Sequence, residues 1–297
     1  MSSNLTIEQK SGKASSRLRV FSELIKARLT LMVLVTTTMG FYLATNAMDW
    51  LLLFRALFGT GLLACGAAAL NQYLEKDLDA KMQRTASRPI PVGQIAPETA
   101  LLLGGALSAA GLVYIASQVN LLTSVIGAVT LVSYIAVYTP LKRVTPINTV
   151  VGAVPGALPP LMGWTAAGGE ITEKGLALVA ILYFWQLPHF FAIAWIYREE
   201  YAKAGFVMLS LDDESGERTS QQAVAYAVSL LPFSILPYAF GMAGAVYFAG
   251  AIILGGLYLA FAISFYRKLS IASARRLFIY SIVYLPLLLG LIFLDRT

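Results

Sequence analysis

The stretch GLLACGAAALNQYLEKDLDA, residues 61–80, passes directly from an apolar run to a dense group of charged and amide side chains. If one helix continues through it, Asn71, Glu75 and Asp79 stand at positions i, i+4 and i+8 and share one face. Carboxylates at this spacing repel each other, and acids at a membrane boundary are costly unless a cation lies between them. The stretch therefore predicts a membrane helix whose last turns carry acids that need a cation.

The composition of the whole chain is typical of a polytopic membrane protein. Hydrophobic residues make up 58% of the 297 residues and charged residues only 13%, unlike most soluble globular domains. Apolar segments of about twenty residues are long enough to cross a bilayer as helices. We expect nine of them, near residues 29–48, 51–74, 98–117, 120–139, 149–168, 175–197, 221–241, 244–265 and 277–294. The predicted fold is all-α, and the fifth span should be kinked because it contains Pro155, Pro159 and Pro160.

The chain has a net charge of +6, and its cations are distributed as expected for a membrane topology rather than for a nucleic-acid-binding surface. Lysine and arginine gather before the first span and after the second, fourth, sixth and eighth spans, so by the positive-inside rule these connections are cytoplasmic. The amino terminus is then inside and the carboxyl terminus outside. We expect a cytoplasmic tail (1–25) and a single membrane-embedded domain (26–297) with active-site loops at 75–97, 140–148 and 198–220. No signal peptide pattern is present, so a bacterial inner (plasma) membrane is the expected location.

The charged residues that follow the second span suit a magnesium diphosphate. Mg²⁺ prefers oxygen ligands and commonly combines one or two carboxylates with substrate phosphates, which favours Glu75 and Asp79 as ligands. Arg84 and Arg88 follow in a proline-containing loop, and guanidinium groups suit phosphate oxygens. The alternative is an ordinary cytoplasmic loop whose cations obey the positive-inside rule. That alternative explains the arginines but not the face shared by Asn71, Glu75 and Asp79.

The pattern N-x3-E-x2-L-D-x2-M-x-R-T-x2-R-x4-G, from Asn71 to Gly93, resembles the motif of the UbiA superfamily of intramembrane prenyltransferases. The resemblance implies an all-helical fold of nine spans that binds an isoprenyl diphosphate through Mg²⁺ and two acidic motifs. It also implies transfer of the prenyl group to an acceptor inside the membrane. The residues expected to be catalytic are Asn71, Glu75, Asp79 and Lys142.

Two later stretches, YTPLKRVTPINT (138–149) and WQLPHFFAIAWIYREEYAKAG (185–205), resemble the members of this superfamily that farnesylate haem. The resemblance implies that the chain transfers a farnesyl group from farnesyl diphosphate to a vinyl group of haem B, giving haem O. Lys142 and Arg143 then stabilise the leaving diphosphate, whose charge develops in the transition state.

The remaining charged candidates come from two further elements. Glu199 and Glu200 stand where the superfamily usually has a second motif, D-x3-D, and IKARLTL (25–31) resembles the K-P-R-x-T element of the family with alanine in place of proline. The residues expected to bind diphosphate are Lys26, Arg28, Arg84, Arg88, Lys142 and Arg143, and those expected to bind metal are Glu75, Asp79, Glu199 and Glu200.

His189 is the only histidine in the chain. On a continuous helix it shares a face with Glu200 and lies about 16 Å deeper. Neutral imidazole is a frequent ligand of haem iron, so we expect His189 to hold the porphyrin, with Trp185 and Tyr138 lining its pocket. The alternative is that His189 only forms a hydrogen bond to a neighbouring helix.

Two other functions stay open at this point. An aromatic prenyltransferase of quinone biosynthesis would use the same phosphate site with a different acceptor pocket. A non-catalytic haem-binding or transport protein would explain the nine spans and His189 but not the acidic face. The expected cofactor is Mg²⁺. The expected partners are farnesyl diphosphate, haem B, the lipid bilayer and a haem-copper oxidase assembly factor or haem A synthase, and no nucleic acid is expected.

Overall fold

The computed structural model describes residues 17–297, so the first sixteen residues of the predicted cytoplasmic tail lie outside the described part of the chain. Within residues 17–297, nine helical spans are long and apolar enough to cross a membrane, which confirms the predicted number. They are α2 (Ala27–Ala44), α3 (Trp50–Asp79), α4 (Pro97–Gln118), α5 (Leu121–Val132) continued by η1 (Ser133–Tyr138) and α6 (Thr139–Leu141), α7 (Asn148–Ala157) with α8 (Pro159–Gly168), α9 (Glu173–Ile196), α11 (Glu217–Ala239), α12 (Ala245–Lys268) and α13 (Ile271–Leu294). The short helices α10 (Arg198–Ala204) and η2 (Leu209–Leu211) connect α9 to α11.

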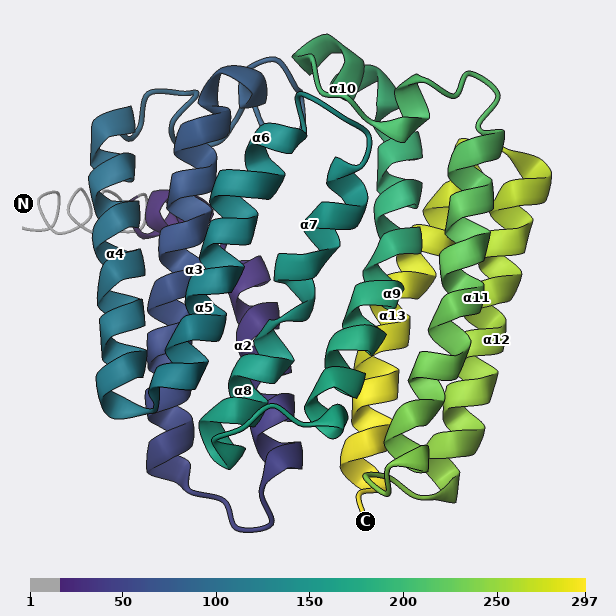
Figure 1. Cartoon of the computed structure of the whole chain (residues 1–297). Coiled ribbons are helices and arrows are strands. Elements are labelled where there is room, and N and C mark those ends of the chain that lie inside the picture. The colour runs from purple at the N-terminus through teal and green to yellow at the C-terminus, as the bar shows by residue number, and fades with distance from the viewer. Residues whose placement is uncertain (1–16) are drawn as a thin grey trace, which may run out of the picture.

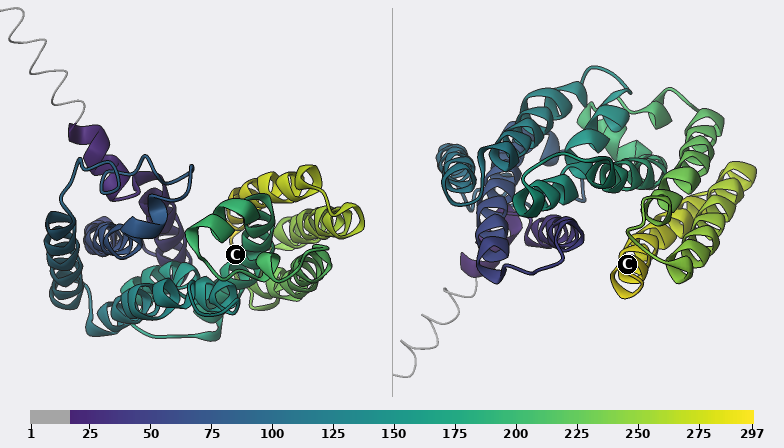
Figure 2. Two further views of the ribbon diagram at one scale, coloured as in Figure 1. Left: turned by 90° about the horizontal axis from the view of Figure 1, so that it is seen from above. Right: turned by 60° about the horizontal axis from the view of Figure 1, so that its bottom comes forward.

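The spans form two groups joined by a central set of helices. Helices α3, α4 and α5 lie on one side, α11, α12 and α13 on the other, and α7, α8 and α9 lie between them (Figure 1). Seen from above, α2 lies beside α3 on the inner side of this arrangement (Figure 2). The short helices α6 and α10 are at the same end of the bundle, hereafter the α10 end (Figure 1). The three predicted active-site loops also lie at this end.

Helix α3 continues without a break through the charged stretch, as its sequence predicts. It is 30 residues long and contains no proline, and the side chain of Asp49 caps its first turn. Asn71, Glu75 and Asp79 all lie on its buried side. Beyond the last turn, the Thr85 hydroxyl donates a hydrogen bond of 2.9 Å to the carbonyl oxygen of Asp79 and folds the following loop back.

The fifth span is broken where its prolines predict a kink. Helix α7 ends at Ala157, and Pro159 and Pro160 occupy the first turn of α8. Proline has no backbone N–H, so it is tolerated at a helix start but cannot continue the hydrogen bonds of a preceding helix. The break leaves Pro155 and Pro159 on the wall of an internal cavity.

Helices α2 and α8 cross at a distance that only glycine allows. A Cβ atom added to Gly163 would overlap the carbonyl oxygen of Thr37, and one added to Gly40 would overlap that of Pro160. Small residues at a helix crossing let two backbones touch, which is a common way for membrane helices to associate. The two glycines therefore fix α2 against the central helices.

The fourth span changes from α-helix to π-helix at η1. This wider turn places Tyr134 and Tyr138 in a stack with ring centroids 5.9 Å apart, and both line the internal cavity. The carbonyl oxygen of Tyr134 accepts from the backbone N–H of Thr139 and also from the Thr139 hydroxyl, at 2.9 Å. Such π turns are rare and are frequent at functional sites.

Candidate active site

A cavity of about 520 Å³ lies inside the bundle, bordered by α2, α3, η1, α7, α8 and α9. Away from the α10 end its walls are apolar and include Leu63, Leu131 and Met162. Toward the α10 end it is lined by Lys26, Asn71, Glu75, Asp79, Arg84, Arg88 and Lys142. A cavity with a charged end and a long apolar part suits a ligand made of an anionic head and a hydrocarbon chain.

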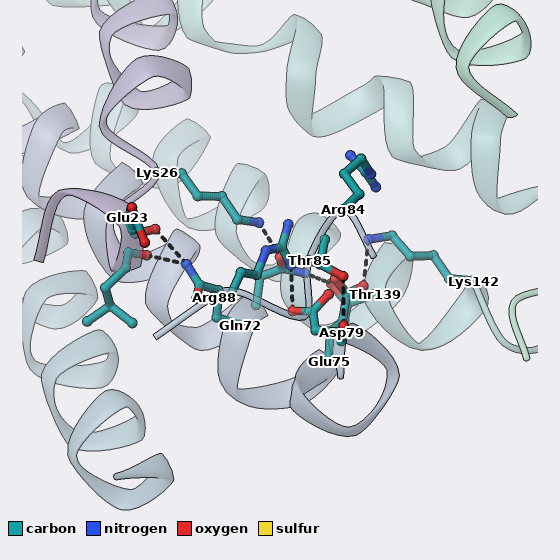
Figure 3. Close-up of polar contacts among 12 residues, drawn as sticks. Glu23, Lys26, Gln72, Glu75, Asp79, Arg84, Thr85, Arg88, Thr139 and Lys142 are labelled. Atoms are coloured by element: carbon teal, nitrogen blue, oxygen red, sulfur yellow. Dashed lines mark hydrogen bonds and ion pairs between the residues drawn. The ribbon is translucent and has the colours of Figure 1, made fainter. Parts of the chain in front are cut away.

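The two acids of α3 are paired with cations from two different loops (Figure 3). Lys142 Nζ lies 2.6 Å from Glu75 Oε1, and Arg88 Nη1 lies 2.5 Å from Asp79 Oδ2. Glu75 is 5% exposed and Asp79 is 1% exposed, so an unpaired charge on either would be costly. The cation that the acidic face requires is thus supplied here by the protein itself.

The acidic pair still has an oxygen that fits a metal ion. Asp79 Oδ1 is buried and has no hydrogen-bond partner within residues 17–297. Mg²⁺ typically takes one or two carboxylates and completes its shell with water and phosphate oxygens, and Glu75 with Asp79 supplies that number. The donor set is therefore compatible with one Mg²⁺ at the charged end of the cavity.

The side chain of Lys26 reaches the same site from the start of α2. Its Nζ donates to Asn71 Oδ1 at 2.5 Å, and Asn71 Nδ2 donates to Thr139 Oγ1 at 3.3 Å. The Lys26 backbone is left-handed, with φ 48°, a conformation that is rare outside glycine. Gln72 holds the segment just before α2 in place, because its Nε2 donates to the carbonyl oxygens of Glu23 and Leu24 at 2.8 and 2.9 Å. The sequence analysis did not single out Gln72, although an amide in an apolar helix indicates a side chain that needs a hydrogen-bond partner.

Two lysines at this site have pKa values shifted in opposite directions. Burial, together with the nearby Arg88, lowers the pKa of Lys26 to about 7. Burial by itself also lowers the pKa of Lys142, but Tyr138 and the Glu75 carboxylate outweigh it and raise that pKa above its ordinary value. Near neutral pH, the site therefore combines a permanently charged Lys142 with a Lys26 whose charge changes with pH.

The predicted diphosphate-binding residues divide into two sets. Lys26, Arg84, Arg88 and Lys142 line the cavity, whereas Arg28 and Arg143 are exposed and do not line it. The Arg84 guanidinium lies over the rings of Tyr197 and Tyr201, at 5.5 and 5.9 Å from their centroids. These aromatic rings hold Arg84 near the cavity mouth. The structure thus gathers four of the six predicted cations.

The four predicted metal ligands do not come together. Within the described residues, no group of three or more histidine, cysteine, aspartate or glutamate side chains is placed to hold a metal. Glu200 instead accepts a hydrogen bond of 3.2 Å from the backbone N–H of Arg84, and Glu199 is exposed. Helix α9 ends at Ile196, and α10 begins at Arg198 in a new direction. The expectation that Glu200 continues the face of His189 is therefore wrong, because the helix is interrupted between them.

Of the three residues predicted to contact haem, one lines the cavity and two do not. Tyr138 lines the cavity, and Lys142 Nζ lies 4.4 Å from its ring centroid. His189 and Trp185 do not line it but turn toward α13, where His189 Nδ1 lies 2.6 Å from Ser281 Oγ and Trp185 Nε1 donates to the Ser281 carbonyl oxygen at 2.8 Å. Within α9, the cavity is lined instead by Gln186, Phe190, Ile193 and Ala194, which sequence reasoning did not single out.

Comparison with known sequences gives a consistent family assignment. Residues 33–285 match the model of the UbiA prenyltransferase family. A protohaem IX farnesyltransferase from Solibacter usitatus is 44% identical over 289 residues, which cover 94% of this chain and 99% of that protein. A protohaem IX farnesyltransferase from Koribacter versatilis is 40% identical over 295 residues, covering 95% of each chain.

Comparison with solved structures shows the same fold. A digeranylgeranylglyceryl phosphate synthase matches with a TM-score of 0.80 at 17% identity, covering 94% of this chain and 98% of that one. A UbiA homologue from Archaeoglobus fulgidus, bound to GPP and Mg²⁺, matches with a TM-score of 0.64 at 15% identity, covering 92% and 99% of the two chains. At these identities the likeness concerns the helical architecture alone.

Proposed function

Because the chain belongs to the UbiA prenyltransferase family, and within it to the protohaem IX farnesyltransferases, we propose that it transfers a farnesyl group from farnesyl diphosphate to a vinyl group of haem B, giving haem O. The observation that carries the proposal is the cavity, which joins a charged end containing Glu75, Asp79, Arg88 and Lys142 to a long apolar part. A quinone-forming prenyltransferase is less well supported, because the near full-length relatives bear the haem-modifying name.

The charged end is proposed to hold the diphosphate of the donor. Glu75 and Asp79 would hold Mg²⁺, which when bound supplies positive charge to the phosphate oxygens. Arg84, Arg88, Lys26 and Lys142 line the same end and stabilise the negative charge that grows on the leaving diphosphate. Asn71 links Lys26 to Thr139 and so orients the Lys26 ammonium group.

The apolar part is proposed to hold the isoprenoid chain. Between Asn71 and Thr60, both on the cavity wall, α3 rises about 16 Å, which is similar to the length of an extended farnesyl chain. Tyr134 and Tyr138 line the cavity, and the Tyr138 ring lies beside Lys142 of the charged end. We propose that the allylic carbon lies beside these rings, because aromatic faces attract positive charge. The vinyl carbon of haem B attacks this carbon, and water then adds to the resulting cation. The apolar walls delay that water until the new bond has formed.

The direct test is product formation. Membranes that contain the protein should convert haem B to a more apolar haem, detected by chromatography, when farnesyl diphosphate and Mg²⁺ are present, and removal of Mg²⁺ by a chelator should stop the reaction. Prenylation of an aromatic acid in place of haem would favour the quinone alternative. Bound haem that stays unmodified under all conditions would favour the non-catalytic alternative.

Raising the pH through about 7, the pKa of Lys26, is expected to weaken binding of farnesyl diphosphate. Lys26 is charged below this pH and neutral above it, so one charge-assisted contact to the diphosphate is lost as the pH rises. The expected loss in affinity is on the order of tenfold. Titration of the purified protein with farnesyl diphosphate at several pH values measures it.

The matched control is Lys26→Arg, because a guanidinium keeps its charge throughout this range. This variant should bind with little change between the same pH values. An equal pH dependence in both proteins would show that another group is responsible.

The chain is a multi-pass membrane protein, and we propose that its 26–297 region is one domain in a bacterial inner membrane. Its bacterial relatives support this location. The lysines and arginines near the α10 end support a cytoplasmic position for that end, with the amino terminus on the same side and the carboxyl terminus outside. A haem A synthase or a haem-copper oxidase assembly factor is the proposed user of the product.

A further inference from the structure

The apolar part of the cavity ends in a packed floor. The lining residues farthest from the α10 end are Thr60 on α3, Thr130 on α5 and Met162 on α8. Leu63 lines the cavity one helical turn from Thr60. Met162 and Leu63 are only 1% and 4% exposed, so their side chains are enclosed by other residues. Leu63 and Met162 are called the cavity floor below.

The ends of the two floor side chains meet against a glycine of α5. A Cβ atom added to Gly127 would lie 2.9 Å from Leu63 Cδ2 and 3.2 Å from Met162 Cε. Leucine and methionine therefore fill the space that a larger residue of α5 would occupy. The floor is thus formed where three helices, α3, α5 and α8, contact one another.

Hydrogen bonds join α5 to α8 one turn below the floor. Thr165 follows Met162 by one turn of α8, Thr123 precedes Gly127 by one turn of α5, and their hydroxyl oxygens lie 2.9 Å apart. Asn120 Nδ2 also donates to the carbonyl oxygen of Thr165 at 2.8 Å. These bonds hold the two helices together beneath the cavity, so a ligand that reaches the floor cannot continue between them.

From this arrangement we propose that Leu63 and Met162 determine the length of the isoprenoid chain that the protein transfers. The inference rests on the proposed function, because the chain is that of the allylic diphosphate held at the charged end. Leu63 and Thr60 stand about 12 and 16 Å along α3 from Asn71, a span that an extended farnesyl chain fills.

Longer and shorter chains fit this span less well. A geranylgeranyl chain has one more isoprene unit and would overlap the Met162 thioether, which has packed neighbours behind it. A geranyl chain has one unit fewer and would leave the floor without apolar contact. Leu63 and Met162 are therefore specificity-determining residues that act at the end of the chain opposite to the reaction.

The experiment measures the rates at which geranyl, farnesyl and geranylgeranyl diphosphate are used with haem B and Mg²⁺, with the prenylated haems separated by chromatography. The wild type should prefer farnesyl diphosphate. Met162→Ala should raise the ratio of geranylgeranyl to farnesyl transfer on the order of tenfold. Adding Leu63→Ala should raise it further, because the two changes together remove about the volume of one isoprene unit.

The matched control for these variants is Met242→Ala. Met242 belongs to the same buried core as Met162 and is 4% exposed, but it does not line the cavity. This variant should keep the wild-type preference. An equal shift in Met242→Ala would show that loosened packing, and not the floor, changes the preference, and would overturn the proposal.

Gly127→Ala tests the floor in the opposite direction and leaves no hole in the core. Its methyl group would push the flexible ends of Leu63 and Met162, which lie on the cavity wall, toward the interior. The ratio of geranyl to farnesyl transfer should then rise on the order of tenfold. Gly105→Ala, where a Cβ atom would meet nothing within 4 Å, is the control and should keep the wild-type ratio. This pair carries the test if the Met162 variants do not fold.

The two possible failures can be told apart. Farnesyl transfer that continues with an unchanged chain-length preference in the floor variants and in Gly127→Ala would overturn the proposed role of the floor and leave the proposed function intact. A wild-type protein that modifies haem with none of the three diphosphates would overturn the proposed function itself.

Discussion

Replacing Asp79 by asparagine is expected to slow prenyl transfer by roughly 10²–10³-fold, the range found when one group that stabilises transition-state charge is removed. Asparagine keeps the size of the side chain and an oxygen near Arg88, but its amide has no charge to hold Mg²⁺. The free oxygen of Asp79 is buried and unpartnered within the described residues, so it is available to bind a metal ion, and the variant removes one of the two proposed carboxylate ligands. The rate of haem O formation as a function of Mg²⁺ concentration measures the effect.

The control for this variant is Asp77→Asn, two residues earlier on the same helix. Asp77 is exposed and points away from the cavity, so its charge can be removed without a change in rate. The amount of each variant in the membrane should match that of the wild type. Wild-type rates for Asp79→Asn at every Mg²⁺ concentration would refute the proposed metal site.

Replacing Gly163 by alanine is expected to destabilise the protein by about 1–3 kcal/mol or more, the range found for overpacked interiors. The added methyl group would overlap a backbone carbonyl, that of Thr37, which cannot turn aside as a side chain can. Relief then requires α2 to move away from α8. The midpoint of thermal unfolding in detergent and the fraction of monodisperse protein report the change.

The matched control is Gly105→Ala in α4, where a Cβ atom would meet nothing within 4 Å. Alanine is the better helix former by about 1 kcal/mol, so this variant should be as stable as the wild type or more stable. Equal unfolding midpoints for the two alanine variants would contradict the close crossing of α2 and α8.

The parts of the fold that depend on local geometry were predictable from the sequence. Apolar segments of membrane length gave the nine spans, and the prolines gave the break in the fifth one. The spacing of Asn71, Glu75 and Asp79 placed them on one face of α3, because helical periodicity needs only neighbouring residues.

The partners of the charged and polar side chains in the site could not be predicted in the same way. The acidic face indicated that a cation was needed, but Glu75 finds it in Lys142, 67 residues away, and Asn71 accepts from Lys26, 45 residues earlier. Such contacts depend on how separate helices pack, which no local pattern reports. The sequence therefore predicted the need for positive charge and not its source.

The second acidic element shows how a correct periodicity can be extended too far. The face shared by His189 and Glu200 assumed one helix across residue 197, but Tyr197 has φ −108° and ψ 21° and separates α9 from α10. Glu200 consequently contacts the loop after α3. No proline or glycine marks this break in the sequence, so hydropathy and turn signals gave no warning.

The π-helical turn η1 sets the register of the residues that follow it. A π turn holds about one residue more than an α turn, so it takes up one extra residue without changing the direction of the side chains that follow. If residues 133–138 formed a regular α-helix instead, the following segment would be rotated by about 100° and Lys142 would face away from Glu75. A one-residue alignment gap at this position in another sequence is therefore compatible with a regular α turn there and with the same pairing of its lysine with the acid.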